Sequence, residues 1–68
     1  MKDLAKRFGD NLRKMRLSKS IAQEKLALMA QIDRSYIGRI ERGEVNITLE
    51  KAYMLASVLE CDVRELLP

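Results

Sequence analysis

Residues 23–43 read QEKLALMAQIDRSYIGRIERG, and this stretch decides the fold. Its apolar positions recur at helical spacing in two short runs, which predict one helix over about 23–30 and a second over about 34–42. Asp33 stands at the N-cap position, where its carboxylate is expected to accept free amides of the second helix, and Gly43 is a natural helix stop. The few residues between the two helices allow only a tight turn, so the stretch predicts a helix-turn-helix unit.

The flanking segments add three more predicted helices. A helix over about 4–17 carries one apolar stripe, and Thr48 begins another over about 49–59. Asp62, followed three residues later by Glu65, forms a capping box that predicts a short helix over 63–67. The side chains expected to face the core are Leu4, Phe8, Leu12, Met15, Leu26, Ala27, Ala30, Ile32, Ile37, Ile40, Leu49, Ala52, Leu55, Ala56 and Leu59. The expected fold is therefore all-α, a compact five-helix domain over 1–68.

The composition of the 68 residues excludes several classes of protein. The chain has one cysteine, Cys61, and no histidine, so neither an internal disulfide nor an ordinary zinc site can form. No apolar run approaches the length of a membrane span, and the start is charged, so we expect a cytoplasmic protein. Without histidine, a glycine-rich phosphate loop or paired carboxylates, we expect no enzyme, no cofactor and no small-molecule ligand.

Charge is distributed unevenly along the chain. Residues 1–19 carry seven Lys or Arg against two Asp, whereas residues 44–68 carry two basic groups against five acids. The basic end is a candidate surface for phosphates. An ordinary solvated helix face is the alternative.

The outward side of the second short helix is rich in hydrogen-bond donors. It carries Arg34, Ser35, Gly38, Arg39 and Arg42, with Tyr36 at its edge, and no outward acid. Arginine matches the two acceptors on a guanine edge in the major groove. In a helix-turn-helix, the second helix enters that groove while the first crosses the backbone, so this surface predicts a DNA-reading helix.

Three motifs resemble a known family. They are Gln23-Glu24-Lys25-Leu26-Ala27, then Ile32-Asp33-Arg34-Ser35-Tyr36-Ile37, then Arg39-Ile40-Glu41-Arg42-Gly43, and Asn46-Ile47-Thr48-Leu49 continues the pattern. Together they resemble the Xre-type, Cro/repressor helix-turn-helix regulators, which have the lambda-repressor-like DNA-binding fold. The second motif and the short chain look most like the controller proteins of restriction–modification systems.

This resemblance implies roles for individual residues. Bases would be contacted by Arg34, Ser35, Tyr36 and Arg39. Phosphates would be contacted by Gln23, through its side chain or backbone amide, and by Arg42 and Asn46. Arg16 and Glu41 would form a partly buried ion pair that explains an acid beside a DNA surface. The alternatives are an ordinary solvated role for any of the contact residues, packing of Tyr36 against the first short helix, and an exposed Glu41.

The chain also departs from the family pattern. Ala22 stands where the first short helix usually has a Ser or Thr cap. Gln31 stands where the turn usually has glycine, so either Gln31 adopts a left-handed backbone or the turn differs. Gly38, inside the second short helix, fits either a close approach to DNA or neutral drift at the surface.

A dimer is expected, because a chain this short is marginally stable alone and DNA half-sites are usually read by dimers. Tyr53, Val63 and Leu67, in the apolar and acidic C-terminal third, are the predicted anchors, unless these residues only complete the monomer core. The expected function is a transcription regulator that binds a palindromic operator as a homodimer and controls a restriction–modification operon. A phage-type repressor, an antitoxin-like regulator and a protein-interaction module that binds no DNA remain alternatives.

Overall fold

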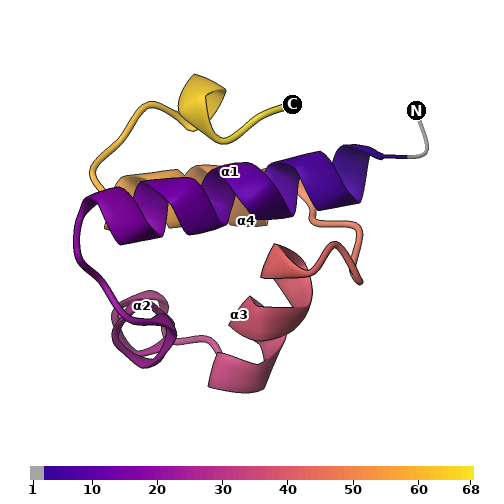
Figure 1. Ribbon diagram of the computed structural model, residues 1–68. Coiled ribbons are helices and arrows are strands. Elements are labelled where there is room, and N and C mark those ends of the chain that lie inside the picture. The colour runs from indigo at the N-terminus through magenta and orange to yellow at the C-terminus, as the bar shows by residue number, and fades with distance from the viewer. Residues whose placement is uncertain (1–2) are drawn as a thin grey trace.

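The computed structural model describes residues 3–68 as a set of helices (Figure 1). The elements are α1 (Leu4–Ser18), α2 (Gln23–Ala30), α3 (Arg34–Glu41), α4 (Leu49–Val58) and a single 3₁₀ turn, η1 (Val63–Glu65). These residues include no strand, so the all-α expectation is confirmed. Lys2, one of the seven basic residues of the stretch 1–19, lies outside the described residues.

The four helices and η1 pack around one apolar core. α1 packs against α3, α2 against both α3 and α4, and η1 against α4, so that α2 and α3 lie on one side of α1 and η1 on the other (Figure 1). The large side chains with almost no exposed surface are Leu12, Leu26, Ile37, Ile40, Leu55, Leu59 and Leu66. Because all four helices contribute to this set, together with Leu59 just after α4 and Leu66 just after η1, burial of apolar area orients the helix-turn-helix unit against the rest of the chain.

The backbones of α1 and α3 touch at Gly9. A Cβ atom at this position would lie 2.3 Å from the carbonyl oxygen of Ile40 and 2.7 Å from that of Glu41. No side chain fits there, because both neighbours are backbone atoms that cannot rotate away. Gly9 therefore sets the distance between α1 and α3.

A buried ion pair joins the same two helices. Arg16 and Glu41 are only 7% and 6% exposed. The Arg16 Nε donates to Glu41 Oε2 at 2.7 Å, and Arg16 Nη2 donates to Oε1 at 3.0 Å. Arg16 Nη1 also donates to the carbonyl oxygen of Ile21 at 2.8 Å, so the guanidinium holds the connection between α1 and α2 as well. Such bidentate, charge-assisted bonds compensate for the loss of water around both charges.

Non-glycine residues with a left-handed backbone follow three of the four helices. Ser20, just after the C-cap of α1, has φ 58°. Gln31 follows α2 with φ 57° and ψ 42°, so the turn keeps its geometry without the usual glycine. Glu60, just after the C-cap of α4, has φ 55°. At the start of α2, Ala22 offers no side-chain cap.

The N-cap expectation for Asp33 is wrong in its detail. Asp33 does occupy the N-cap position of α3, but its side chain accepts no backbone amide of the helix. It accepts a hydrogen bond from the Ser35 hydroxyl instead. A short polar side chain in the first turn competes with the amides for the same carboxylate.

The expected fifth α-helix is also wrong, since residues 63–65 form one 3₁₀ turn. The predicted capping box is present, and Arg64 lowers the pKa of the Asp62 carboxyl to about 2 through side-chain and backbone hydrogen bonds. The turn stops because Pro68 has no backbone N–H and disfavours a helical conformation at Leu67. Asn11 Nδ2 takes up the last carbonyls, donating to those of Leu66 at 3.1 Å and Leu67 at 3.2 Å.

Two residues expected in the core are exposed. Leu4 is 41% exposed and Leu49 is 70% exposed, although each fits the apolar stripe of its helix. Both are the first residue of their helix, where the neighbouring elements cover less of the apolar stripe than they do farther along. The helix ends also shift by one residue, since α1 includes Ser18, α3 stops at Glu41 and α4 stops at Val58.

We expect Arg16→Ala to lower the free energy of unfolding by about 3–5 kcal/mol, because it leaves the Glu41 carboxylate buried without its cation. Thermal or urea unfolding measures the change. Arg13→Ala, on the exposed side of the same helix, is the control and should change stability by less than about 0.5 kcal/mol. An unchanged melting temperature in Arg16→Ala would contradict the structural role of the pair.

Candidate nucleic-acid interface

The outward face of α3 and the start of α2 enclose a shallow hollow, which we call the notch. It has a volume of about 350 Å³ and is lined by Gln23, Arg34, Ser35, Gly38, Arg39 and Arg42. Five of these six residues are ones predicted to contact DNA, and the notch brings their side chains together. All the α3 side chains around it are exposed, so their donors are available to a ligand.

Gly38 forms the floor of the notch. The sequence pattern placed it outward, but the helix turns and side chains around it bury it. A Cβ atom there would lie 3.1 Å from Arg42 Nη1 and 3.8 Å from Gln23 Oε1. Both are ends of flexible side chains, so the Arg42 guanidinium covers Gly38 and can move away from it.

Gln23 is held at the edge of the notch by the buried ion pair. Its Nε2 donates to Glu41 Oε1 at 3.0 Å. Because an ionised carboxylate can only accept hydrogen bonds, the amide nitrogen must face Glu41. The carbonyl Oε1 therefore lies on the Gly38 side, and only part of this side chain remains free for a phosphate. The backbone amides at the start of α2 are left without a side-chain cap.

An acid that the sequence reasoning did not single out stands beside the notch. Glu44 Oε2 accepts a hydrogen bond from Arg42 Nε at 2.7 Å, and Glu44 Oε1 lies 4.0 Å from Arg39 Nε. The hydrogen bond from Arg42 lowers the pKa of Glu44 and raises that of Arg42. The helix stop at Gly43 is the signal that could have found Glu44, since a left-handed residue there folds the chain back over α3.

Tyr36 occupies a second hollow, next to the notch. It is half-buried and shares this hollow with Ile32, Asp33, Ser35, Arg39 and Lys51. Lys51 Nζ lies 5.8 Å from the centroid of the Tyr36 ring, within the range of a cation–π contact. The ring therefore packs partly against the protein, and Lys51 adds a cation that the sequence reasoning did not include.

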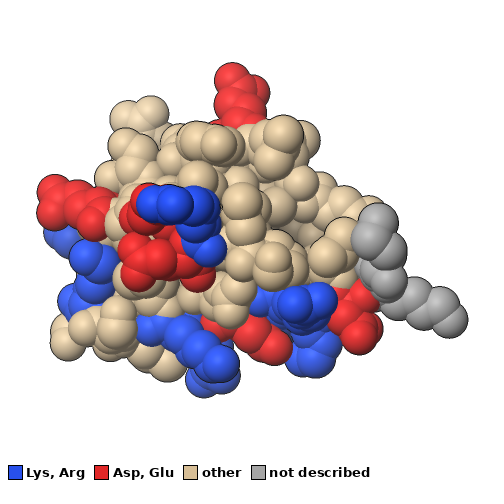
Figure 2. Space-filling model, turned by 90° about the horizontal axis from the view of Figure 1, so that it is seen from above, with Lys and Arg blue, Asp and Glu red and all other residues tan. Residues whose placement is uncertain are grey.

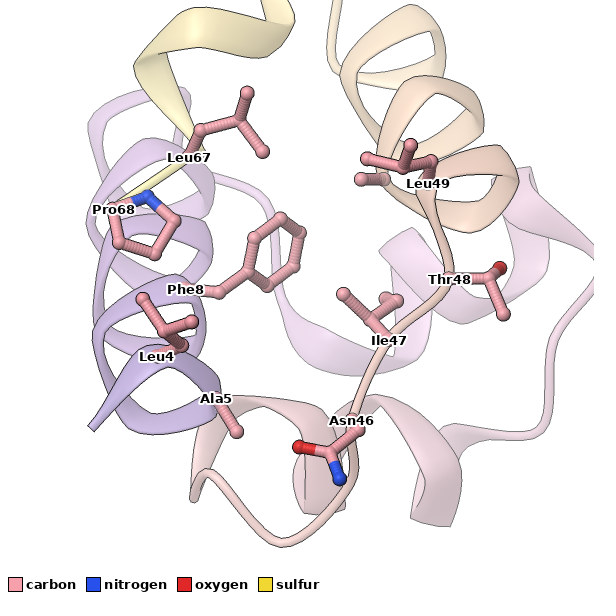
Figure 3. Close-up of a pocket in the computed structure, with 10 residues that line it drawn as sticks. Leu4, Ala5, Phe8, Asn46, Ile47, Thr48, Leu49, Leu67 and Pro68 are labelled. Carbon is pink, nitrogen blue, oxygen red and sulfur yellow. The ribbon is translucent and has the colours of Figure 1, made fainter. Parts of the chain in front are cut away.

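Asn46 lies apart from the other predicted contact residues. It is exposed at the edge of an apolar pocket of about 290 Å³ between the start of α1, the segment before α4 and the C-terminal residues (Figure 3). Leu4, Leu49 and Leu67 surround the same pocket, with Phe8 at its base (Figure 3). Asn46 thus lines the apolar pocket and not the notch.

The predicted dimer anchors differ in exposure. Tyr53 is 60% exposed and stands one helical turn after Leu49, so the two side chains share a face of α4. Leu67 borders the pocket, whereas Val63 is half-buried against the core. Figure 2 looks at the side of the molecule that carries η1, where uncharged residues fill the centre of the view. Among the exposed large apolar side chains of residues 3–68, Leu4, Leu49 and Leu67 border the pocket and none lines the notch, whereas Leu28 and Met29 are exposed on α2.

Other kinds of site have little support. Within residues 3–68, no three His, Cys, Asp or Glu side chains are close enough to hold a metal ion. No helix of this part of the chain is both long enough and apolar enough to span a membrane. Cys61 is half-buried, and burial raises the pKa of its thiol.

Comparison with known proteins places the chain among helix-turn-helix proteins. The helix-turn-helix family HTH_3 matches residues 12–66. The chain is 41% identical over 61 residues to control protein C.BamHI of Bacillus amyloliquefaciens, covering 88% of this chain and 75% of that protein. It is 37% identical over 65 residues to control protein C.SmaI of Serratia marcescens, covering 96% and 77%. The crystal structure of the restriction-modification controller protein C.AhdI from Aeromonas hydrophila superimposes with a TM-score of 0.86 and 42% identity, covering 91% of this chain and 94% of that one.

Two glycine-to-alanine substitutions should have opposite effects on stability. Gly38→Ala should raise the free energy of unfolding by up to about 1 kcal/mol, because alanine favours the helix and only the end of Arg42 must move. Gly9→Ala should lower it by about 1–3 kcal/mol, because its Cβ would overlap backbone oxygens of α3. Thermal unfolding of the two variants beside the wild type measures both. A shift of the same sign in both variants would show that the space around these glycines does not determine the change in stability.

Proposed function

This chain belongs to the helix-turn-helix (HTH_3) family and to its restriction–modification control proteins, which are DNA-binding regulators and not enzymes; from that premise we propose that it binds a palindromic operator as a homodimer and regulates a restriction–modification operon. Residues 23–43 act as the reading unit of one domain over 1–68. The site of action is the cytoplasm, where operator DNA lies.

The notch is the observation that carries the proposal. It combines the donors of Arg34, Ser35, Arg39 and Arg42 around Gly38, which has no side chain. A base edge in the major groove offers acceptors at the spacing of a guanidinium, and each bidentate pair contributes roughly 1–3 kcal/mol of discrimination. Arg34 and Arg39 are the residues assigned to guanine. Ser35 and Tyr36 are assigned to neighbouring positions of the same groove.

Phosphate contacts on either side of the groove would fix the position of the reading helix. The uncapped start of α2 offers free backbone amides at the positive end of the helix dipole, which suits a phosphate oxygen. In this arrangement Gln23 contributes mainly its backbone amide, since its side chain is bonded to Glu41. Arg42 and Asn46 would contact phosphates beyond the C-terminal end of α3.

The proposed dimer uses the apolar surface away from the notch. Leu49 and Tyr53 project from one face of α4, and the pocket beside them offers about 290 Å³ to side chains of a second copy. Tyr53, Val63 and Leu67 remain the proposed anchors, and Leu49 joins them because of its exposure. Burial of this surface would stabilise a chain whose own core is small.

The proposal is tested by DNA binding of the arginine variants. Arg34→Ala and Arg39→Ala should each weaken binding to a duplex selected from a random pool by about 1–3 kcal/mol, because each removes a base contact. The affinity of the wild type for random duplex should fall steeply with salt. Fluorescence anisotropy measures both.

Arg64→Ala is the control, since Arg64 is also an exposed arginine but pairs with Asp62, the N-cap residue of η1. Its affinity should stay within about twofold of the wild type. If the wild type bound neither duplex in a salt-dependent way, the chain would be an interaction module that binds no DNA, and the proposed function would be wrong.

The dimer is tested by charging its proposed surface. Leu49→Lys and Tyr53→Lys should shift the protein to monomer at micromolar concentration, because each would place a charge in an apolar contact. Sedimentation equilibrium measures the shift. Leu28→Lys is the matched control, since Leu28 is exposed on α2. A wild type that sediments only as monomer, or variants that sediment like the control, would contradict this interface.

A further inference from the structure

We propose that Glu44 is a positioning residue that sets DNA specificity, by holding Arg39 for base contact and by weakening the contacts of Arg39 and Arg42 with phosphates. This inference rests on the proposed function and deepens it. It assigns a role to an acid that pairs with two arginines of the notch and that the base and phosphate contacts leave unused.

The backbone of Glu44 is fixed against the end of α3. Its N–H donates to the carbonyl oxygen of Arg39 at 2.9 Å, and the Gly43 N–H donates to that of Ile40 at 3.0 Å. These two bonds form a Schellman motif, which needs the left-handed backbone that Gly43 provides at φ 76°. Gly43 is itself packed against Lys6, with 2.7 Å from its Cβ position to the Lys6 Cα. The carboxylate therefore starts from a defined place beside Arg39.

The Glu44 carboxylate faces the Nε atoms of both arginines. The Arg42 Nε donates to Glu44 Oε2 at 2.7 Å, and the Arg39 Nε lies 4.0 Å from Oε1. Within residues 3–68, no hydrogen bond occupies the terminal nitrogens of either guanidinium group, and Arg42 Nη1 lies beside Gly38. These are the atoms that can donate together to one guanine edge, so a complex with base contacts can keep Glu44 in place.

The position of Glu44 is unfavourable for the helix itself. It stands at the negative end of the α3 dipole, where a carboxylate destabilises a helix and a cation stabilises it. Its pairing with Arg42 and Arg39 compensates for that position, and the resulting hydrogen bond lowers the pKa of Glu44, so the group is charged at neutral pH. Helix stability therefore gives no reason for an acid here.

Binding to random DNA should be weakened by this arrangement. Without matching bases, Arg39 and Arg42 gain only phosphate contacts, and a phosphate must then displace or face the Glu44 carboxylate. Both members of the pair are about half exposed, so phosphates can displace Glu44 at a modest cost. Operator DNA recovers this cost because Glu44 keeps Arg39 directed at bases. The ratio of operator to random affinity should thus depend on Glu44.

The test compares Glu44→Gln with Glu60→Gln, which changes the net charge equally. Glu60 is exposed, and residues 3–68 provide it with no ion pair. The probes are a random-sequence duplex and a duplex selected from a random pool by the wild type, titrated at several salt concentrations. Glu44→Gln should tighten random binding by about 3- to 10-fold and leave selected-duplex binding unchanged or weaker. The slope of its log affinity for random duplex against log salt should steepen by roughly 0.9, since one more phosphate contact is made by an arginine with no carboxylate beside it.

Two further variants separate a positioning role from a structural one. Glu44→Asp keeps the charge, so its random-duplex affinity should stay near that of the wild type. In an Arg39→Gln/Arg42→Gln background, Glu44→Gln should tighten random binding by less than about twofold, because no arginine remains to be released. Equal shifts on both duplexes, or a Glu44→Gln protein that matches Glu60→Gln, would overturn the inference while leaving salt-dependent DNA binding, and so the proposed function, intact.

Discussion

The buried pair of Arg16 and Glu41 is the interaction on which the rest of the structure depends. It joins α1 to α3, and through the Ile21 carbonyl and the Gln23 amide it also holds the connection before α2 and the first residue of α2. Each charge is buried, so each would be strongly destabilising without the other. The relative position of three helices therefore depends on this pair and its hydrogen bonds. Gly9 makes this possible by letting α1 approach the α3 backbone. A reading helix held this way presents its donors in a fixed arrangement.

Periodic burial made most of the fold predictable. The helix-turn-helix unit and the inward Ile37 and Ile40 follow from spacing alone, because a core residue must recur once per turn. Leu4 and Leu49 fit the same spacing but are exposed, since periodicity shows which face is apolar and not whether anything covers its end. The predicted fifth helix was wrong for a local reason, because Pro68 prevents a longer helical segment.

The candidate site was predictable where it lies on one helix. The residues of α3 around the notch share a face that the sequence displays directly. Glu44 and Lys51 were not found, because each reaches the site through chain reversal or tertiary packing, at Gly43 and beside Tyr36 respectively. Asn46 shows that closeness in sequence can also mislead. It follows α3 closely in the chain but lies at the apolar pocket and not at the notch.

The side-chain amide of Asn11 has a mechanical consequence. It clamps the C-terminal carbonyls to α1, while Arg16, five residues later on the same helix, clamps α3. The two clamps are separated by about 7.5 Å of a continuous helix, a rigid element at this length. The C-terminal residues that border the proposed dimer surface and the reading helix are thus both attached to one rigid helix, so a displacement at either end is transmitted to the other through α1.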